Sequence, residues 1–180
     1  ELVQFYCDVF GFHESHHEDV ASEYSAMNSK VVQDRAGRIK FPIVEPAPGK
    51  RKSQISEYLS YHYGPGVQHI ALLVDDIITS VRSLRENDIE FLRTPDSYYD
   101  ALKSRIGEID LDQKAIRELG ILVDRDEWGY LMQTFTKSLH SRPTIFLEII
   151  QRNDARGFGA GNIRALFEAL EREQLQRGNL

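Results

Sequence analysis

Two apolar segments, each holding one ionisable side chain, constrain the fold of this chain more than any other feature. Residues 66–74 read Gly-Val-Gln-His-Ile-Ala-Leu-Leu-Val, and residues 144–150 read Thr-Ile-Phe-Leu-Glu-Ile-Ile. Both are rich in apolar and β-branched residues, which predicts two buried strands. Their ionisable residues are His69 and Glu148. A carboxylate is rarely buried unless it is paired or binds a metal.

One histidine and one carboxylate, each isolated in an apolar strand, are two of the three ligands of a facial 2-His-1-carboxylate Fe(II) site. A second interpretation stays open for His69, because buried polar groups are usually hydrogen-bonded and a core histidine needs no metal. The other tempting ligands are His13, His16 and His17. They crowd a polar segment without an apolar frame to exclude water, which argues against a site there.

Composition excludes several classes of function. The 180 residues are 41% hydrophobic and carry a formal net charge of -6, which is typical of one globular domain or two fused modules. No basic cluster suggests nucleic acid, and no apolar run is long enough to cross a bilayer. The single cysteine, Cys7, excludes an internal disulfide and suits a cytoplasmic protein. The chain opens inside a helical pattern, so we expect it to begin within a domain.

The order of predicted elements repeats. We expect helices over 2–10, 53–63, 76–87, 96–102 and 112–119, and strands over 12–20, 24–33, 38–46, 66–74, 89–92, 121–124, 130–136 and 144–151. This order predicts an α+β fold of paired βαβββ modules that form an open half-barrel around a metal cleft. The first module covers residues 1–65 and lacks its lead strand; the second covers 66–155. In the missing strand we expect a symmetric counterpart of His69.

The C-terminal segment, residues 156–180, differs in character from both modules. Glycines at 157, 159 and 161 precede a helix whose apolar stripe includes Ile163, Leu166 and Phe167. Glycines before a helix can bind phosphate, but no P-loop lysine follows them here. We expect a lid helix that closes over the cleft on a glycine hinge. The charged end, residues 168–177, is predicted to be a solvent-exposed helix face.

Five motifs together resemble one known family. They are residues 66–71 (Gly-Val-Gln-His-Ile-Ala), 94–99 (Thr-Pro-Asp-Ser-Tyr-Tyr), 133–136 (Gln-Thr-Phe-Thr), 146–150 (Phe-Leu-Glu-Ile-Ile) and 157–162 (Gly-Phe-Gly-Ala-Gly-Asn). In this order, and over essentially the whole chain, they resemble the catalytic half of the 4-hydroxyphenylpyruvate dioxygenases and 4-hydroxymandelate synthases, which have the vicinal-oxygen-chelate fold. The resemblance implies a non-haem Fe(II) enzyme that uses O₂ to decarboxylate and oxidise a small α-keto acid, and that is often a homo-oligomer.

The resemblance also assigns roles to residues. His69 and Glu148 would bind the metal, with a third ligand, a histidine, before Glu1. The implied substrate pocket consists of Ser29, Gln54, Gln68, Gln133, Phe135, Phe146, Phe158 and Asn162. Gln133 and Phe135 are also candidates for a direct role in the reaction. Phe146 and Phe158 could equally be core residues.

Two positions separate the product branches of this family. Residues 42–46 read Pro-Ile-Val-Glu-Pro, with Val44 where the homogentisate-forming enzymes have Asn, and Ile163 replaces a Phe of their lid. Both aliphatic residues resemble the branch that hydroxylates the benzylic carbon to give (S)-4-hydroxymandelate, which would serve antibiotic biosynthesis. Pro42 instead resembles the homogentisate branch. We favour the synthase, with the dioxygenase as the alternative. A non-catalytic small-molecule-binding module of the same fold is a third possibility.

Overall fold

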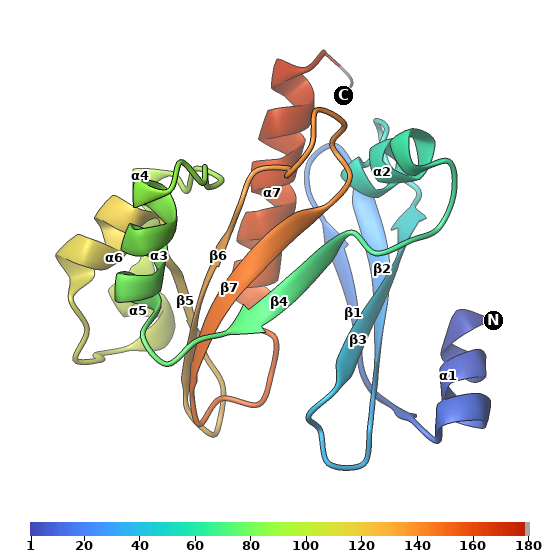
Figure 1. The fold of residues 1–180 in the computed structure, drawn as a ribbon, viewed down its shortest axis with the longest axis horizontal. Helices are drawn as coiled ribbons and strands as arrows, with labels where there is room; N and C mark the ends of the chain where they lie inside the picture. Colours follow the sequence, from blue (N-terminus) through green and yellow to red (C-terminus); the bar gives the residue numbers. More distant parts are fainter. Residues whose placement is uncertain (179–180) are drawn as a thin grey trace.

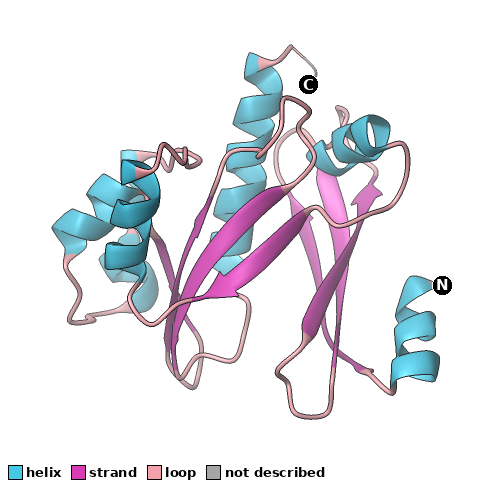
Figure 2. Ribbon diagram, in the orientation of Figure 1, coloured by secondary structure: helices cyan, strands magenta, loops and turns pink. Residues whose placement is uncertain are grey.

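Two β-sheets and the long C-terminal helix organise the molecule, which is described here for residues 1–178 from a computed structural model (Figure 1). The first sheet has the strand order β1-β2-β3 and the second has the order β4-β7-β6-β5. Figure 2 shows that helices gather on one side of the second sheet and that α7 runs behind its strands.

The elements of the N-terminal part are α1 (Leu2–Phe10), β1 (His13–Ala21), β2 (Ala26–Gln33), β3 (Lys40–Ala47) and α2 (Gln54–His62). The second part contains β4 (His69–Leu73), α3 (Ile77–Glu86), α4 (Asp96–Asp100), α5 (Leu102–Ile106), α6 (Gln113–Leu119), β5 (Leu122–Arg125), β6 (Tyr130–Phe135), β7 (Phe146–Asn153) and α7 (Ala160–Gln176). Neighbouring strands are antiparallel except for β4 and β7, which run parallel. A parallel lead strand followed by a helix and an antiparallel sheet is the predicted βαβββ order, so the predicted fold class is confirmed.

Side-chain caps fix where several helices begin. Ser53 accepts a hydrogen bond from the Ser56 amide at the start of α2. Asp76 and Asp112 cap α3 and α6 in the same way. Such caps satisfy backbone amides that have no partner within the helix. At the other end, α1 stops at Gly11, whose φ of 67° is left-handed and suits a residue without a Cβ. These boundaries agree with those predicted from the sequence.

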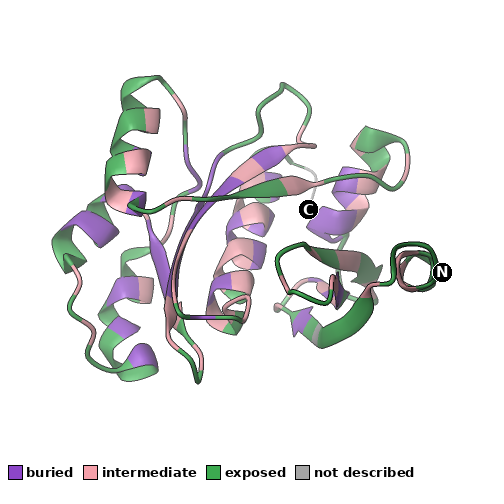
Figure 3. Cartoon of the chain, turned by 60° about the horizontal axis from the view of Figure 1, so that its bottom comes forward, coloured by how far each residue is buried: buried purple, intermediate pink, exposed green. Residues whose placement is uncertain are grey.

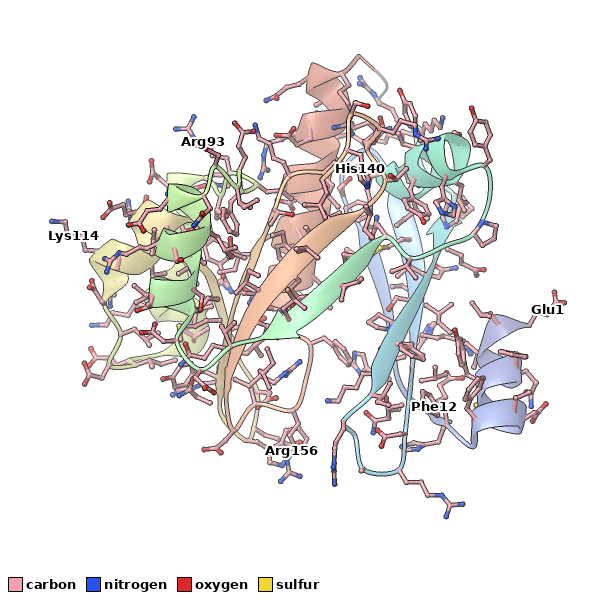
Figure 4. All side chains as sticks on the ribbon, viewed as in Figure 1. Glu1, Phe12, Arg93, Lys114, His140 and Arg156 are labelled. Atoms are coloured by element: carbon pink, nitrogen blue, oxygen red, sulfur yellow. The ribbon has the colours of Figure 1, made fainter. Side chains whose placement is uncertain are left out.

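The two faces of the second sheet carry different side chains. Met132 and Ile149 pack on its outer face against Ile77, Val81 and Ile116 of the covering helices. Because side chains alternate along a strand, the neighbouring residues Gln133 and Glu148 point to the inner face. Figure 3 shows buried residues along the sheet and on the helix faces turned toward it, whereas charged side chains such as Lys114 project outward (Figure 4). The inner face, which carries these polar side chains, is therefore the face on which a functional site can lie.

Helix α7 packs against both sheets. Leu166, Ala169 and Leu170 belong to a cluster with Leu122, Phe135 and Phe146 of the second sheet. On another side of the same helix, Phe167 and Ile163 belong to a cluster with Val20, Met27 and Val44 of the first sheet. Helix α7 therefore connects the two modules, because it belongs to an apolar cluster of each sheet.

Three local predictions were wrong. The strand predicted over 66–74 forms as β4 but is not buried, because Ile70, Leu72 and Leu73 are 46%, 43% and 71% exposed at the edge of the second sheet. Residues 89–92 form no strand: Phe91 makes a single bridge to Thr136, and Leu92 donates one backbone hydrogen bond to Phe135. The end of α7 is not a uniformly exposed face, because Glu171 is 4% exposed and Gln174 is 0% exposed. Ser22 and Ser25 donate hydrogen bonds to Glu171 Oε1 at 2.8 and 2.5 Å. Arg177 pairs with Glu57. Packing between two modules buries positions that the helical pattern assigned to solvent.

Within the described residues, no helix combines the length and the apolar character that a membrane crossing requires.

The packing of α7 predicts a measurable loss of stability. Phe167 is 1% exposed, so Phe167→Ala should lower the free energy of unfolding by about 3–5 kcal/mol, because it leaves a cavity between the modules. Leu175 lies on the same helix and is 47% exposed; Leu175→Ala is the control and should cost about 0.5 kcal/mol. Urea unfolding of the protein measures both. Equal losses for the two variants would contradict this packing.

Candidate metal centre

The register of β4 and β7 brings His69 and Glu148 together. His69 pairs with Phe146 and Ala71 pairs with Glu148 in this parallel pair. The two ionisable residues are therefore two positions apart on neighbouring strands and point to the same face. His69 Nε2 lies 3.7 Å from Glu148 Oε2.

The Glu148 carboxylate is buried, with 6% of the residue exposed. Burial raises its pKa because the charged form loses hydration, while the hydrogen bond from Gln133 and the charge of Arg152 oppose this shift. Gln133 Nε2 donates that hydrogen bond to Glu148 Oε1 at 2.6 Å. One carboxylate oxygen is thus held by an amide, and the other faces His69.

Aromatic rings surround the imidazole of His69. The Phe146 ring stacks on it with centroids 5.0 Å apart, and Phe135 meets it edge-on at 6.4 Å. Burial lowers the pKa of His69 to about 4, because the apolar surroundings disfavour the imidazolium. The ring is therefore neutral at physiological pH, which is the form that binds metals.

A second amide pair orients the imidazole. Gln54 Oε1 accepts a hydrogen bond from Gln68 Nε2 at 2.7 Å, which leaves Gln68 Oε1 to face His69 Nδ1 at 3.3 Å. With the proton on Nδ1, the lone pair of Nε2 points toward Glu148. Metal-binding histidines commonly have such a partner on the other ring nitrogen.

These two side chains fit a divalent cation. Imidazole nitrogen and carboxylate oxygen bind such ions at about 2.0–2.2 Å, so atoms 3.7 Å apart are within reach of one ion. Neutral imidazole and carboxylate also match the donor set of non-haem Fe(II) sites. In the described part of the chain, no third His, Cys, Asp or Glu joins this pair. The third ligand stays a prediction, as do the roles of both residues.

The other predicted pocket residues lie in three places: next to Gln133, at the contact between α7 and the first sheet, and near Lys40. Asn162 is fully buried and its Nδ2 donates to Gln133 Oε1 at 2.8 Å, which connects α7 to the His69–Glu148 pair. Ser29 is buried in the first sheet, directly opposite Val44 on β3. Val44 and Ile163 share the cluster between α7 and the first sheet. Phe158 lies apart from that cluster, with Lys40 Nζ 5.3 Å from its ring centroid.

A cavity of about 50 Å³ adjoins the site. Its lining includes Gln54, Gln68 and Phe146, which belong to or contact the surroundings of His69, and also the charged residues Lys137 and Arg177. The histidines of β1 lie away from these residues. His17 pairs with Asp19, and His13 contacts Gln33.

Sequence reasoning missed one polar residue near this site. Tyr98 of α4 donates a hydrogen bond to Asn162 Oδ1 at 2.7 Å. The sequence offered only its place in the 94–99 motif, which was interpreted as the start of a helix.

Two modules of helices and antiparallel strands, with the His69–Glu148 pair on the inner face of the second sheet, have the arrangement expected of a vicinal-oxygen-chelate fold. The chain belongs to the Glyoxalase/Bleomycin resistance protein/Dioxygenase superfamily, whose family model matches residues 1–134. The predicted resemblance to 4-hydroxyphenylpyruvate dioxygenases and 4-hydroxymandelate synthases is confirmed by individual relatives.

Curated relatives include the 4-hydroxyphenylpyruvate dioxygenases of Neurospora crassa and Sus scrofa. The first is 50% identical and matches 98% of this chain and 45% of its own length. The second is 54% identical and matches 89% of this chain and 42% of its own length. The chain therefore spans a little under half the length of these relatives.

Among solved structures, a mutant of 4-hydroxymandelate synthase from Streptomyces coelicolor is similar, with a TM-score of 0.84 and 46% identity. The match covers 96% of this chain and 50% of the other. A fusion of a xylose isomerase-like TIM barrel with 4-hydroxyphenylpyruvate dioxygenase matches with a TM-score of 0.71 and 27% identity. That match covers 94% of this chain and 26% of the other.

The lowered pKa of His69 predicts a pH dependence of stability in the metal-free protein. The unfolded chain takes up a proton near pH 6.5, whereas the folded imidazole stays neutral down to about pH 4. The free energy of unfolding should therefore decrease as the pH is lowered from about 6.5 to about 4, by up to about 1.4 kcal/mol per pH unit. His69→Gln has no titrating ring and should lose less between pH 7 and pH 5 in urea unfolding. Parallel pH profiles for the two proteins would contradict a His69 that is neutral in the folded protein.

Proposed function

We propose that the intact protein is an Fe(II)-dependent dioxygenase that converts 4-hydroxyphenylpyruvate and O₂ into (S)-4-hydroxymandelate and CO₂. The observation that carries this proposal is the His69–Glu148 pair, in which a neutral imidazole and a buried carboxylate lie 3.7 Å apart on one sheet face. When bound there, Fe(II) would supply the chemistry that activates O₂ and holds the two oxygens of the α-keto acid. The similar dioxygenases and synthase support the same substrate class.

The chain's own residues would prepare the site for this chemistry. Phe135 and Phe146 flank His69, so they would exclude water and offer apolar faces to an aromatic substrate. Ser29, Gln54, Gln68 and Gln133 would provide hydrogen bonds to the phenol or the carboxylate of the substrate. Asn162 is buried, and its amide would orient Gln133. Phe158 would complete the apolar wall near the start of α7.

A third ligand is part of the proposal. The lead strand of the second module, β4, lies parallel to the last strand of that module, β7. The same arrangement in the first module would place a lead strand beside β3, with a histidine equivalent to His69. In β4, Ile70, Leu72 and Leu73 are 46%, 43% and 71% exposed, and Val67 just before the strand is 61% exposed. Apolar side chains at a sheet edge favour a further strand or layer that covers them.

Val44 and Ile163 support benzylic over ring hydroxylation. Both lie in the cluster between α7 and the first sheet, so the two branch-defining positions act on the same region. Asn at 44 and Phe at 163 would add an amide and a ring there. Without them, the substrate ring gains room to tilt and to bring its benzylic carbon toward the oxidant. A difference of about 1.4 kcal/mol between two barriers changes the product ratio tenfold.

Homogentisate is the alternative product, and one observation favours it. The curated relatives at 50% and 54% identity are 4-hydroxyphenylpyruvate dioxygenases. Both products have the same composition and use the same substrate, metal and O₂, so product analysis separates the two enzymes.

Removal of either proposed ligand should abolish turnover. His69→Ala and Glu148→Ala in the intact protein should each lose O₂ consumption with 4-hydroxyphenylpyruvate, because among residues 1–178 no further His, Cys, Asp or Glu joins the pair to replace the missing donor. An oxygen electrode measures this loss, and circular dichroism checks the fold. His140→Ala and Glu127→Ala alter exposed residues and should behave like the wild type. Iron-dependent activity in either ligand variant would contradict the assignment. Stoichiometric Fe(II) binding without O₂ consumption in the wild type would indicate a binding module instead.

Product analysis tests the branch. The wild type should release mainly 4-hydroxymandelate, and Val44→Asn with Ile163→Phe should shift part of the flux to homogentisate, because the added groups restrict the ring. Chromatography of the products measures the ratio. Val81→Ile alters a buried apolar residue of α3, in the cluster on the outer face of the second sheet, and is the control for a nonspecific packing change. Homogentisate as the main wild-type product would overturn the branch assignment but not the family.

A further inference from the structure

A chain of side-chain hydrogen bonds connects β5 to Glu148 through the first turn of α7. The Val123 amide donates to Tyr98 Oη at 2.8 Å, and the Tyr98 hydroxyl donates to Asn162 Oδ1 at 2.7 Å. Asn162 Nδ2 then donates to Gln133 Oε1 at 2.8 Å, and Gln133 Nε2 donates to Glu148 Oε1 at 2.6 Å. Gln133 and Asn162 are 4% and 0% exposed, so water does not replace these partners.

Direction matters in this chain because both amides could turn around. In this chain of bonds Gln133 presents its nitrogen to Glu148 and its oxygen to Asn162, which is the orientation that a metal-binding carboxylate, able only to accept hydrogen bonds, requires. Because Asn162 donates from its Nδ2 to Gln133, its Oδ1 faces residue 98. That oxygen needs a hydrogen-bond donor at residue 98. The Tyr98 hydroxyl is that donor. It also lies 2.9 Å from the Val123 carbonyl, so its proton faces one acceptor on β5 and one on α7.

Arg105 holds Tyr98 in place. The Arg105 guanidinium lies over its ring at 4.5 Å, and Arg105 Nη2 donates to the Val123 carbonyl at 3.2 Å. Burial raises the pKa of Tyr98, so the phenol keeps its proton at physiological pH. The residue is therefore a fixed donor aimed at α7.

The start of α7 is docked closely at the same point. The Gly161 amide donates to Asp124 Oδ2 at 2.7 Å. A Cβ on Gly161 would lie 2.9 Å from Arg105 Nη2 and 3.1 Å from Asp124 Oδ2, and Gly159 has a left-handed φ of 73°. These glycines allow the first turn to approach until Asn162 reaches both Tyr98 and Gln133.

We propose that Tyr98 is a positioning residue that couples the docking of the α7 N-terminus to the orientation of the Glu148 carboxylate. This inference rests on the proposed Fe(II) site, because it concerns how one ligand of that site is held. Tyr98 contacts neither His69 nor Glu148 in this chain of bonds; it acts through the two amides between them.

Tyr98→Phe in the intact protein tests the coupling. Removing the hydroxyl frees Asn162 and Gln133 to turn, so the metal-free variant should bind Fe(II) about tenfold more weakly in an anaerobic titration, as is typical when a hydrogen-bond partner of a ligand is lost. O₂ consumption should also exceed product formation. Tyr99→Phe is the matched control: its ring packs edge-on against Tyr98, and its hydroxyl is not in the chain to Glu148. It should bind Fe(II) like the wild type.

Hydrogen exchange provides a second measurement that does not depend on a variant. If docking of the α7 N-terminus strengthens Fe(II) binding at Glu148, then Fe(II) binding must strengthen that docking by the same factor. Hydrogen exchange of the Gly161 and Ile163 amides should therefore slow when Fe(II) binds. Wild-type Fe(II) affinity in a folded Tyr98→Phe variant, or unchanged exchange of these amides on Fe(II) binding, would overturn the inference. Failure of the wild type to bind Fe(II) at all would instead overturn the proposed function.

Discussion

A buried carboxylate is the constraint on which the site depends. Glu148 lies on an apolar strand at 6% exposure, where an unpaired charge would be strongly unfavourable. One oxygen accepts a hydrogen bond from Gln133 and the other faces His69 at 3.7 Å. The second carboxylate oxygen and the neutral imidazole nitrogen would both be able to bind a divalent cation. The parallel register of β4 and β7 creates this geometry.

Both members of the pair are oriented by amides that come from other elements. Gln54 of α2 orients Gln68 beside His69, and Asn162 of α7 orients Gln133 beside Glu148. The same helix α7 joins the clusters of both sheets. The packing of α7 between the two sheets therefore also places Asn162 where it orients Gln133 and Glu148. A substitution far from the His69–Glu148 pair can alter its geometry through the amides, without contacting either residue.

The sequence predicted much of this because the informative signals are local. Isolated ionisable residues in apolar strands identified His69 and Glu148, and caps such as Ser53 and Asp76 fixed helix boundaries. Long-range packing carried no such signal. Glu171 and Gln174 resemble surface positions in a helical pattern, yet both are buried where α7 meets the first module. The Tyr98–Asn162 hydrogen bond joins residues 64 positions apart, so only the folded chain reveals it.

The central claim is that His69 and Glu148 bind one iron ion, and anomalous X-ray diffraction at the iron edge tests it most directly. Crystals of the intact protein grown anaerobically with Fe(II) should show one anomalous peak at about 2.0–2.2 Å from His69 Nε2 and from Glu148 Oε2. A histidine outside this numbering should complete the coordination on the same face. A peak bound elsewhere, or no iron peak between these two side chains in Fe(II)-saturated crystals, would contradict the account.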